Sequence, residues 1–179
     1  MRHDVAGDCP CQRCTMVTPE TVATFQAAIA VFGYAFHIIP RVLEPSVVMT
    51  LGLSRRAQPI PELLVTGMDP DDAQPFLRRL VHKVREGRDY TKEAIQPFLF
   101  SKAGHYARSE VVKDLPDAEW DAWFALGTEV LGGRFPVVQI TISDRNGLFW
   151  DDTGVSARLR GARCIPGQKT KWALPQHQG

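Results

Sequence analysis

The chain has 179 residues, of which 44% are hydrophobic and 23% are charged, and its formal net charge is +1 at pH 7. This length and composition indicate one domain, and the near-zero charge excludes a global field that would steer the protein to nucleic acid or an anionic membrane. No stretch reaches the roughly 20 apolar residues of a membrane span, and the N-terminus lacks the basic-then-apolar pattern of a signal peptide. We therefore expect a cytoplasmic protein, in which the cysteines are thiols or metal ligands rather than disulfides.

The N-terminal arm, residues 1–17, is polar and contains the run C-P-C-Q-R-C. Two cysteines separated by two residues have the spacing of a zinc knuckle, and a third lies close enough to join them. The candidate ligands are Cys9, Cys11 and Cys14, with a fourth from His3 or from Cys164 near the other end of the chain. A structural zinc site, free thiols and a redox pair remain as alternatives.

The first half of the chain predicts one helix followed by three strands. Thr18 is placed to cap a helix that begins at Pro19, and Gly33 is placed to end it. Apolar runs separated by turn residues then predict strands over 34–39, 47–53 and 61–67. His37 lies inside the first run, where a hydrogen-bonded core histidine is expected rather than a ligand.

The middle of the chain predicts two helices with a pair of strands between them. Asp69 and Pro70 open the second helix, which ends at Gly87. The strands of a hairpin are predicted over 95–100 and 106–112, and the second has the weak alternation of a half-exposed strand. Pro116 then opens a third helix that ends at Gly132.

The last structured stretch, residues 135–152, reads F-P-V-V-Q-I-T-I-S-D-R-N-G-L-F-W-D-D. Its β-branched residues favour a buried strand, and Asp144 and Gly147 supply the chemistry of a turn after it. Three carboxylates, Asp144, Asp151 and Asp152, stand near Trp150 and could line a pocket for a cation or a polar ligand. We favour the plainer interpretation, in which Asp144 forms an Asx turn and the other two carboxylates are solvated.

Helices separated by groups of strands predict an α+β domain, with a mixed or mostly antiparallel sheet flanked by about three helices. We place this domain at residues 18–154, between the Cys-containing arm and an extension over residues 155–179. The extension contains no carboxylate and five cations, Arg158, Arg160, Arg163, Lys169 and Lys171. Such a basic tail docks on an acidic partner or on phosphate, or is simply solvated. Nucleic acid is thus a candidate partner, although the net charge does not support it.

Four groups of residues together resemble one family. They are Phe32-Gly33-Tyr34, then Thr50-Leu51-Gly52-Leu53, then Pro61-Glu62-Leu63 with Gly67, and finally Phe135-Pro136-Val137, Gln139, Asp144, Gly147 and Trp150-Asp151. This set is similar to that of the bacterial proteins grouped as domain of unknown function 4262, over roughly Ala27 to Asp152. The resemblance implies a cytoplasmic α+β domain, a Cys-containing arm in many members, and no known activity. Ile60 stands where the family often has His, so any catalysis by that His would be impaired or different here.

Familiar catalytic signatures are absent from the sequence, which has no Walker phosphate loop, no G-x-G-x-x-G, no G-x-S-x-G and no H-E-x-x-H. A site assembled in space remains, and its candidates are Thr50, Glu62, His105 and Asp144, with Trp150 and Asp151 as further ligand candidates. A carboxylate beside His105 would supply an acid and a base. The plainer interpretations are strand packing for Thr50, a strand-edge or capping carboxylate for Glu62 and a loop-tip position for His105.

Two functions from different classes follow, and the sequence leaves open whether the chain is an enzyme. We favour a binding or interaction module, in which a zinc-pinned arm and the basic tail present a surface to a partner. The alternative is a small enzyme or small-ligand-binding protein with a cleft near Glu62, His105 and Asp144. The first predicts an exposed patch without a deep pocket, and the second predicts a concave site with a shifted titration.

Overall fold

The computed structural model describes residues 17–39, 47–66, 68–92, 94–97, 106–112, 115–144 and 146–155. Across these ranges the helices are α2 (Pro19–Phe32), α3 (Pro70–Arg85) and α4 (Asp117–Leu131), with a short 3₁₀ helix, η1 (Leu53–Arg55). The strands are β1 (Ala35–Ile39), β2 (Val47–Leu51), β3 (Glu62–Thr66), β4 (Ala94–Pro97), β5 (Tyr106–Val111) and β6 (Val137–Ile142). Their order along the chain is the predicted one. None of the described helices is long and apolar enough to cross a membrane.

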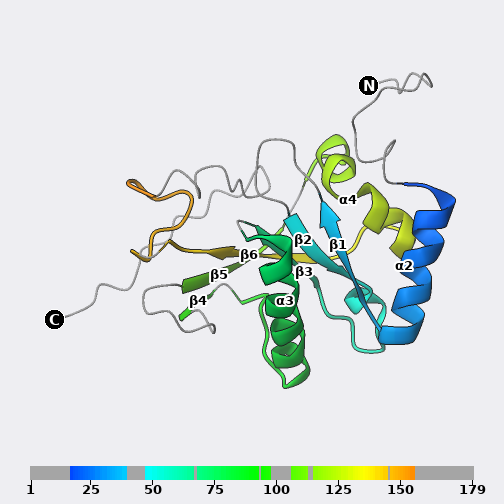
Figure 1. Cartoon of the computed structure of the whole chain (residues 1–179), viewed down its shortest axis with the longest axis horizontal. Helices are drawn as coiled ribbons and strands as arrows, with labels where there is room; N and C mark the ends of the chain where they lie inside the picture. Colours follow the sequence, from blue (N-terminus) through cyan, green and yellow to red (C-terminus); the bar gives the residue numbers. More distant parts are fainter. Residues whose placement is uncertain are drawn as a thin grey trace.

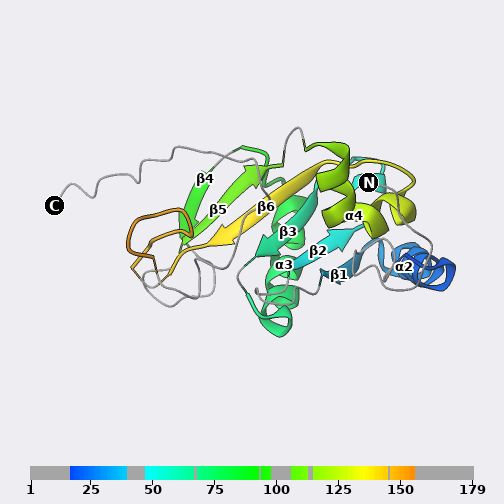
Figure 2. The same cartoon turned by 90° about the horizontal axis from the view of Figure 1, so that it is seen from above.

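The strands form a single mixed sheet in the order β1-β2-β3-β6-β5-β4 (Figure 1), and Figure 2 shows them following one another from β4 to β1. The β3 and β6 strands are parallel, with Glu62 opposite Val137 and Thr66 opposite Thr141. Each of the other neighbouring pairs is antiparallel. The predicted α+β fold with a mixed sheet and flanking helices is therefore confirmed.

Two features of the strands differ from the prediction. The β2 strand ends at Leu51 rather than at residue 53, because Gly52 has a φ of 116° and turns the chain into η1. The β5 strand is not half-exposed, since Arg108, Ser109 and Glu110 in its middle are all buried. This strand lies between β6 and β4, inside the sheet rather than at its edge.

The start of α2 and the C-terminal ends of α2 and α4 follow the predicted capping signals, whereas Asp69 before α3 makes no side-chain capping hydrogen bond. Thr18 has an extended backbone, and its hydroxyl oxygen accepts a hydrogen bond from the Thr21 N–H at 3.2 Å. Gly33 and Gly132 end α2 and α4 in the left-handed conformation that glycine adopts without steric cost. Local sequence thus determines where these helices start and stop.

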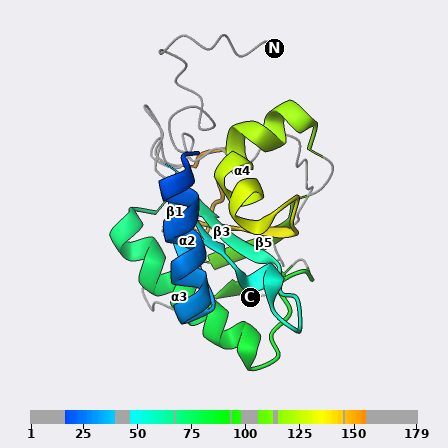
Figure 3. The same ribbon diagram turned by 90° about the vertical axis from the view of Figure 1, so that its right-hand side faces the viewer.

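The helices cover the two faces of the sheet with separate apolar cores. One core joins α2 and α4 to a face of the sheet through residues that include Ile39, Val47, Met49, Leu51, Leu64 and Val137. The other joins α3 to the opposite face through residues that include Val48, Leu63, Val65, Val138 and Ile140. In Figure 3, α4 and α3 accordingly lie on opposite sides of the strands. The loop over residues 146–155, orange in Figure 1, lies at the other end of the molecule from α2.

Gly127 allows α4 to approach the sheet closely. A Cβ at this position would stand 2.7 Å from Cζ of Phe135 and 3.1 Å from Cδ2 of Leu51. The Phe135 ring is itself held by edge contacts with Trp120 and Phe124, whose ring centroids lie at 5.3 and 5.8 Å. The glycine therefore fits the helix against an aromatic cluster that has little freedom to move.

We predict that Gly127→Ala lowers the free energy of unfolding by about 1–3 kcal/mol, because overpacking outweighs the better helix propensity of alanine. Urea titration followed by circular dichroism measures the change. Adding Phe135→Leu to the Gly127→Ala chain shortens the opposing side chain and should recover part of the loss. Equal stability of wild type and Gly127→Ala would show that the packing at this position is loose.

Candidate functional site

The predicted residues Thr50 and Glu62 meet in a buried cluster, which we call the Glu62 cluster and which also contains Gly52 and Ser54. The Thr50 hydroxyl donates to Oε2 of Glu62 at 2.8 Å. Oε1 of Glu62 accepts from the backbone N–H of Gly52 and of Ser54, both at 2.9 Å, and from the Ser54 hydroxyl at 2.8 Å. Glu62 is fully buried, and burial raises the pKa of its carboxyl group while these hydrogen bonds oppose the rise.

The Glu62 cluster fixes a turn that places two arginines at the ends of two helices. Arg55 donates from Nε to the carbonyl oxygen of Leu131, in the last turn of α4, at 3.1 Å. Arg56 places Nη2 3.5 Å from the point where a Cβ on Gly33 would stand, at the end of α2. Neither helix has a basic residue in its own last turn, so the turn supplies the cations that the negative helix ends favour. The capping interpretation of Glu62 fits this geometry.

Asp144 forms the Asx turn that the sequence predicts. Its Oδ1 accepts hydrogen bonds from the backbone N–H of Asn146 at 2.8 Å and of Leu148 at 2.9 Å. The register keeps Asp144 away from Glu62, because Glu62 pairs with the first residue of β6 and Asp144 lies beyond the end of that strand. At about 3.3 Å per residue the two carboxylates are roughly 20 Å apart. His105 lies outside the described residues.

The loop over residues 146–155 brings the remaining predicted residues against the sheet. Asp152 is bound to the loop itself, since its Oδ2 accepts from the Phe149 N–H at 2.7 Å. Asp151 is bound to β5, because its Oδ1 accepts from Nη2 of Arg108 at 2.9 Å. Each of these two carboxylates thus has a protein partner in addition to its contact with solvent, which the prediction of solvated side chains did not include. Nε1 of Trp150 is buried and has no hydrogen-bond partner in the described part of the chain.

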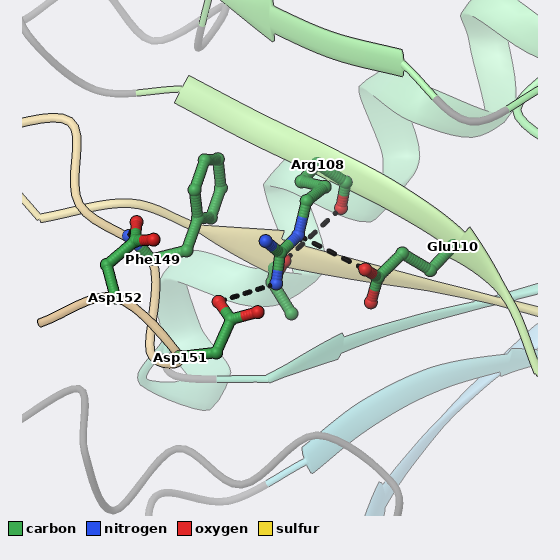
Figure 4. A network of polar contacts seen from close by, with 6 residues as sticks. Arg108, Glu110, Phe149, Asp151 and Asp152 are labelled. Atoms are coloured by element: carbon green, nitrogen blue, oxygen red, sulfur yellow. Dashed lines mark hydrogen bonds and ion pairs between the residues drawn. The ribbon is translucent and has the colours of Figure 1, made fainter. Parts of the chain in front are cut away.

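Arg108 is the centre of a buried charged group, which we call the Arg108 cluster and which contains Glu110, Phe149 and Asp151 (Figure 4). Nε of Arg108 lies 3.2 Å from Oε1 of Glu110, and the guanidinium carbon lies 4.5 Å from the centre of the Phe149 ring. The side chains of Arg108 and Glu110 are 3% and 2% exposed, whereas that of Asp151 is 28% exposed. One cation thus stands between a carboxylate fixed on the sheet and a carboxylate delivered by a loop.

Register extends the Arg108 cluster into a polar area of the sheet, which we call the polar half-face. Arg108 pairs with Thr141 and Glu110 pairs with Gln139, while Thr66 pairs with Thr141 from the other side. Because side chains alternate along a strand, the five residues share one face. All of them are buried. Along the same face, β1 and β2 carry the apolar residues that pack on α2 and α4, so the described helices of this face cover only its apolar half.

The sequence prediction missed Arg108, Glu110, Thr66 and Thr141 as site residues, although a signal was present. Opposite charges two residues apart on a strand point to the same face, and no turn residue separates Arg108 from Glu110. The strand was instead interpreted as half-exposed. Only the folded structure shows that the charged side chains of this face are buried.

The predicted metal ligands Cys9, Cys11, Cys14, Cys164 and His3 lie outside the described residues, as does the basic extension after residue 155. Within the described ranges, no group of three or more His, Cys, Asp or Glu side chains is placed to hold a metal ion. This finding concerns the domain and says nothing of the Cys-containing arm.

His37 lies on the same face of the sheet as the polar half-face, on the apolar side. It is 2% exposed and meets the Phe25 ring edge-on, with ring centroids 5.6 Å apart. Burial lowers the pKa of its imidazole to about 4. His37 is therefore a neutral core residue at pH 7, as expected.

We predict that His37 makes stability fall between pH 6.5 and about 4. Over this window the unfolded chain binds a proton at His37 that the folded chain does not, so the loss reaches up to about 3 kcal/mol. His37→Leu should flatten the curve of unfolding free energy against pH, measured by urea titration. Glu62 titrates with the opposite sign but is present in both chains, so their difference isolates His37. Parallel curves would contradict this role.

The comparison with known families agrees with the resemblance seen in the sequence. The family model described as "Domain of unknown function (DUF4262)" matches residues 4–156. No curated protein and no solved structure matches the chain. Thr50, Gly52 and Glu62, which carry part of the resemblance, meet in the Glu62 cluster, and Asp151 contacts Arg108. The match spans well over half of the sequence, and the chain therefore belongs to the DUF4262 family.

Proposed function

We propose that the domain is a binding module that holds a small polar ligand over the polar half-face. The half-face offers a guanidinium, a carboxylate, an amide and two hydroxyl groups side by side on adjacent strands. These are groups that orient a ligand by hydrogen bonds, and they lie next to an apolar core that keeps them in place.

The observation that carries this proposal is the state of Thr66. Its residue is 3% exposed, and Oγ1 has no hydrogen-bond partner in the described part of the protein. A buried hydroxyl without a partner costs about 1–3 kcal/mol, whereas an apolar side chain of the same shape would avoid that cost. A ligand that accepts or donates a hydrogen bond at Oγ1 would offset it. The buried Nε1 of Trp150 is a second group of this kind.

We predict that Thr66→Val raises the unfolding free energy of the ligand-free chain by about 1 kcal/mol and removes ligand binding. Thr141→Val serves as the comparison for stability alone, because the Thr141 hydroxyl donates to the Arg108 carbonyl at 3.4 Å and its loss should lower stability. Urea titration gives both stabilities. Native and denatured mass spectrometry of the purified chains shows whether a small molecule is bound. A loss of stability in Thr66→Val with the adduct retained would mean that the hydroxyl is structural.

A contact with another protein is a second candidate function. The observation that favours it is the exposure of two apolar side chains at the end of α2, Val31 and Phe32, which are both more than 70% exposed. Ile38, on the edge strand β1, is exposed on the opposite face of the sheet, because its partner Val48 packs against α3. Exposed apolar groups beside an unpaired strand edge are typical of association surfaces. The second candidate function also includes two predictions from the sequence, a basic extension that contacts the partner and a cytoplasmic location.

The proposed interaction module also includes a structural zinc site in the Cys-containing arm, and metal analysis can test this site directly. We expect one zinc per chain, bound by Cys9, Cys11 and Cys14 with Cys164 or His3. Cys11→Ser should release the metal and lower the melting temperature, as measured by elemental analysis and thermal unfolding. Glu62→Gln, which changes a group in the domain, should leave the zinc content unaltered. A full zinc content in Cys11→Ser would remove this site.

A further inference from the structure

We infer that the ligand of the polar half-face carries a carboxylate, which binds Arg108 in the position that Asp151 occupies in this structure. The inference rests on the proposed function, since it names the chemistry of that ligand. It assigns to Asp151 the role of an internal competitor, bound while the site is empty and displaced when the ligand arrives. The reasons lie in the different exposure, geometry and charge of the two carboxylates beside Arg108.

The first reason is that the two carboxylates are held differently. Glu110 is on β5 two residues from Arg108, and both side chains are almost completely buried. Asp151 comes from the loop over residues 146–155 and keeps 28% of its side chain exposed. Solvent therefore reaches the Asp151 side chain from the loop side, whereas Arg108 itself stays buried. An exchange at this position leaves the pair on the sheet intact.

The second reason is that Asp151 satisfies the guanidinium incompletely. The contact joins a single oxygen, Oδ1, to a single nitrogen, Nη2, at 2.9 Å. Nε of Arg108 lies 3.2 Å from Glu110 but has no hydrogen bond of acceptable geometry among the described residues. A guanidinium binds a carboxylate best through two parallel hydrogen bonds. A ligand that is not tethered to a loop can adopt that arrangement.

The third reason is that Phe149 holds the guanidinium in place without using its hydrogen bonds. The ring lies 4.5 Å from the guanidinium carbon, within the range of a cation–π contact. Stacking on a ring face leaves the N–H groups at the edge of the guanidinium directed sideways. Arg108 would thus remain positioned for a new carboxylate after Asp151 moves away.

Charge distinguishes a carboxylate from a phosphate as the incoming group. The Arg108 cluster contains one cation and two anions. Replacing Asp151 by another carboxylate leaves this balance unchanged, whereas a phosphate dianion would add a negative charge close to the buried Glu110. Burying additional charge without a partner is costly. The exchange therefore favours a carboxylate.

The rest of the polar half-face indicates what else the ligand carries. Thr66 lies two strands from Arg108, which is roughly 10 Å at the usual strand spacing. A ligand that reaches both would place a hydroxyl or carbonyl group near Oγ1 of Thr66. The site thus suits a small hydroxy or oxo acid, and malate serves as a probe of that class. Succinate is the matched probe without the hydroxyl, and inorganic phosphate tests the charge argument.

The test measures malate affinity by isothermal titration calorimetry on the full chain. Asp151→Asn removes the competitor, and affinity should rise about tenfold if Asp151 occupies Arg108 about nine-tenths of the time. Arg108→Gln should lose binding. Asp117→Asn is the control, because it removes an exposed carboxylate that pairs with Arg134 elsewhere on the surface, and it should leave affinity unchanged. We expect succinate to bind more weakly than malate, and phosphate more weakly than either.

The outcomes separate this inference from the proposed function. Malate binding that is unchanged or weaker in Asp151→Asn, or a preference for phosphate, overturns the carboxylate exchange but leaves a polar ligand on the half-face. If malate, succinate and phosphate all fail to bind while a neutral molecule co-purifies with the wild type, the carboxylate exchange is likewise overturned and a polar ligand on the half-face is retained. If Asp151→Asn loses its native circular dichroism, the test uses the wild type instead and follows the ¹³C NMR chemical shift of the Asp151 carboxyl group. That shift must move when malate binds, and a constant shift with malate bound overturns the inference.

Discussion

Burying the carboxylate of Glu62 imposes a constraint on everything around it. A carboxylate out of water needs hydrogen-bond donors, and the chain provides four from Thr50, Gly52 and Ser54. Meeting that need fixes the turn between β2 and β3, and the same turn carries Arg55 and Arg56 to the ends of α4 and α2. The two arginines therefore link the ends of both helices to this turn, while the apolar core holds the helices on the sheet. These hydrogen bonds explain how a carboxylate can be fully buried in a central strand.

The buried charge of the Arg108 cluster is compensated by fewer hydrogen bonds than that of Glu62. Glu62 is surrounded by hydrogen bonds on both oxygens, whereas Arg108 makes one good bond to Asp151 and one poorly aligned contact with Glu110. Thr66 nearby has a buried hydroxyl without a partner in the described residues. The Glu62 cluster is thus fully hydrogen-bonded, whereas the Arg108 and Thr66 side chains in the same domain are incompletely hydrogen-bonded. That contrast within one molecule separates a structural cluster from a candidate site.

Sequence predicted the parts of this fold that depend on neighbours along the chain. Thr18 with Pro19, Gly33, Gly132 and the Asx turn at Asp144 act within a few residues, so their effects could be inferred locally. The site depends on distant partners. Arg108 meets Asp151 across 43 positions, and the register between β5 and β6 places it beside Thr141.

Register also explains why the proposed grouping of Glu62 with Asp144 did not form. Each residue was correctly placed at the end of a strand or in a turn, but the parallel pairing of β3 with β6 places them at opposite ends of the sheet.

The parallel pairing of β3 with β6 also has a consequence for folding. Residues 67–136 separate these two strands in the sequence, although the strands lie side by side in the centre of the sheet. The β1–β2–β3 and β4–β5 hairpins close locally, whereas the centre closes a long loop and so carries the larger entropic cost in the folding transition state.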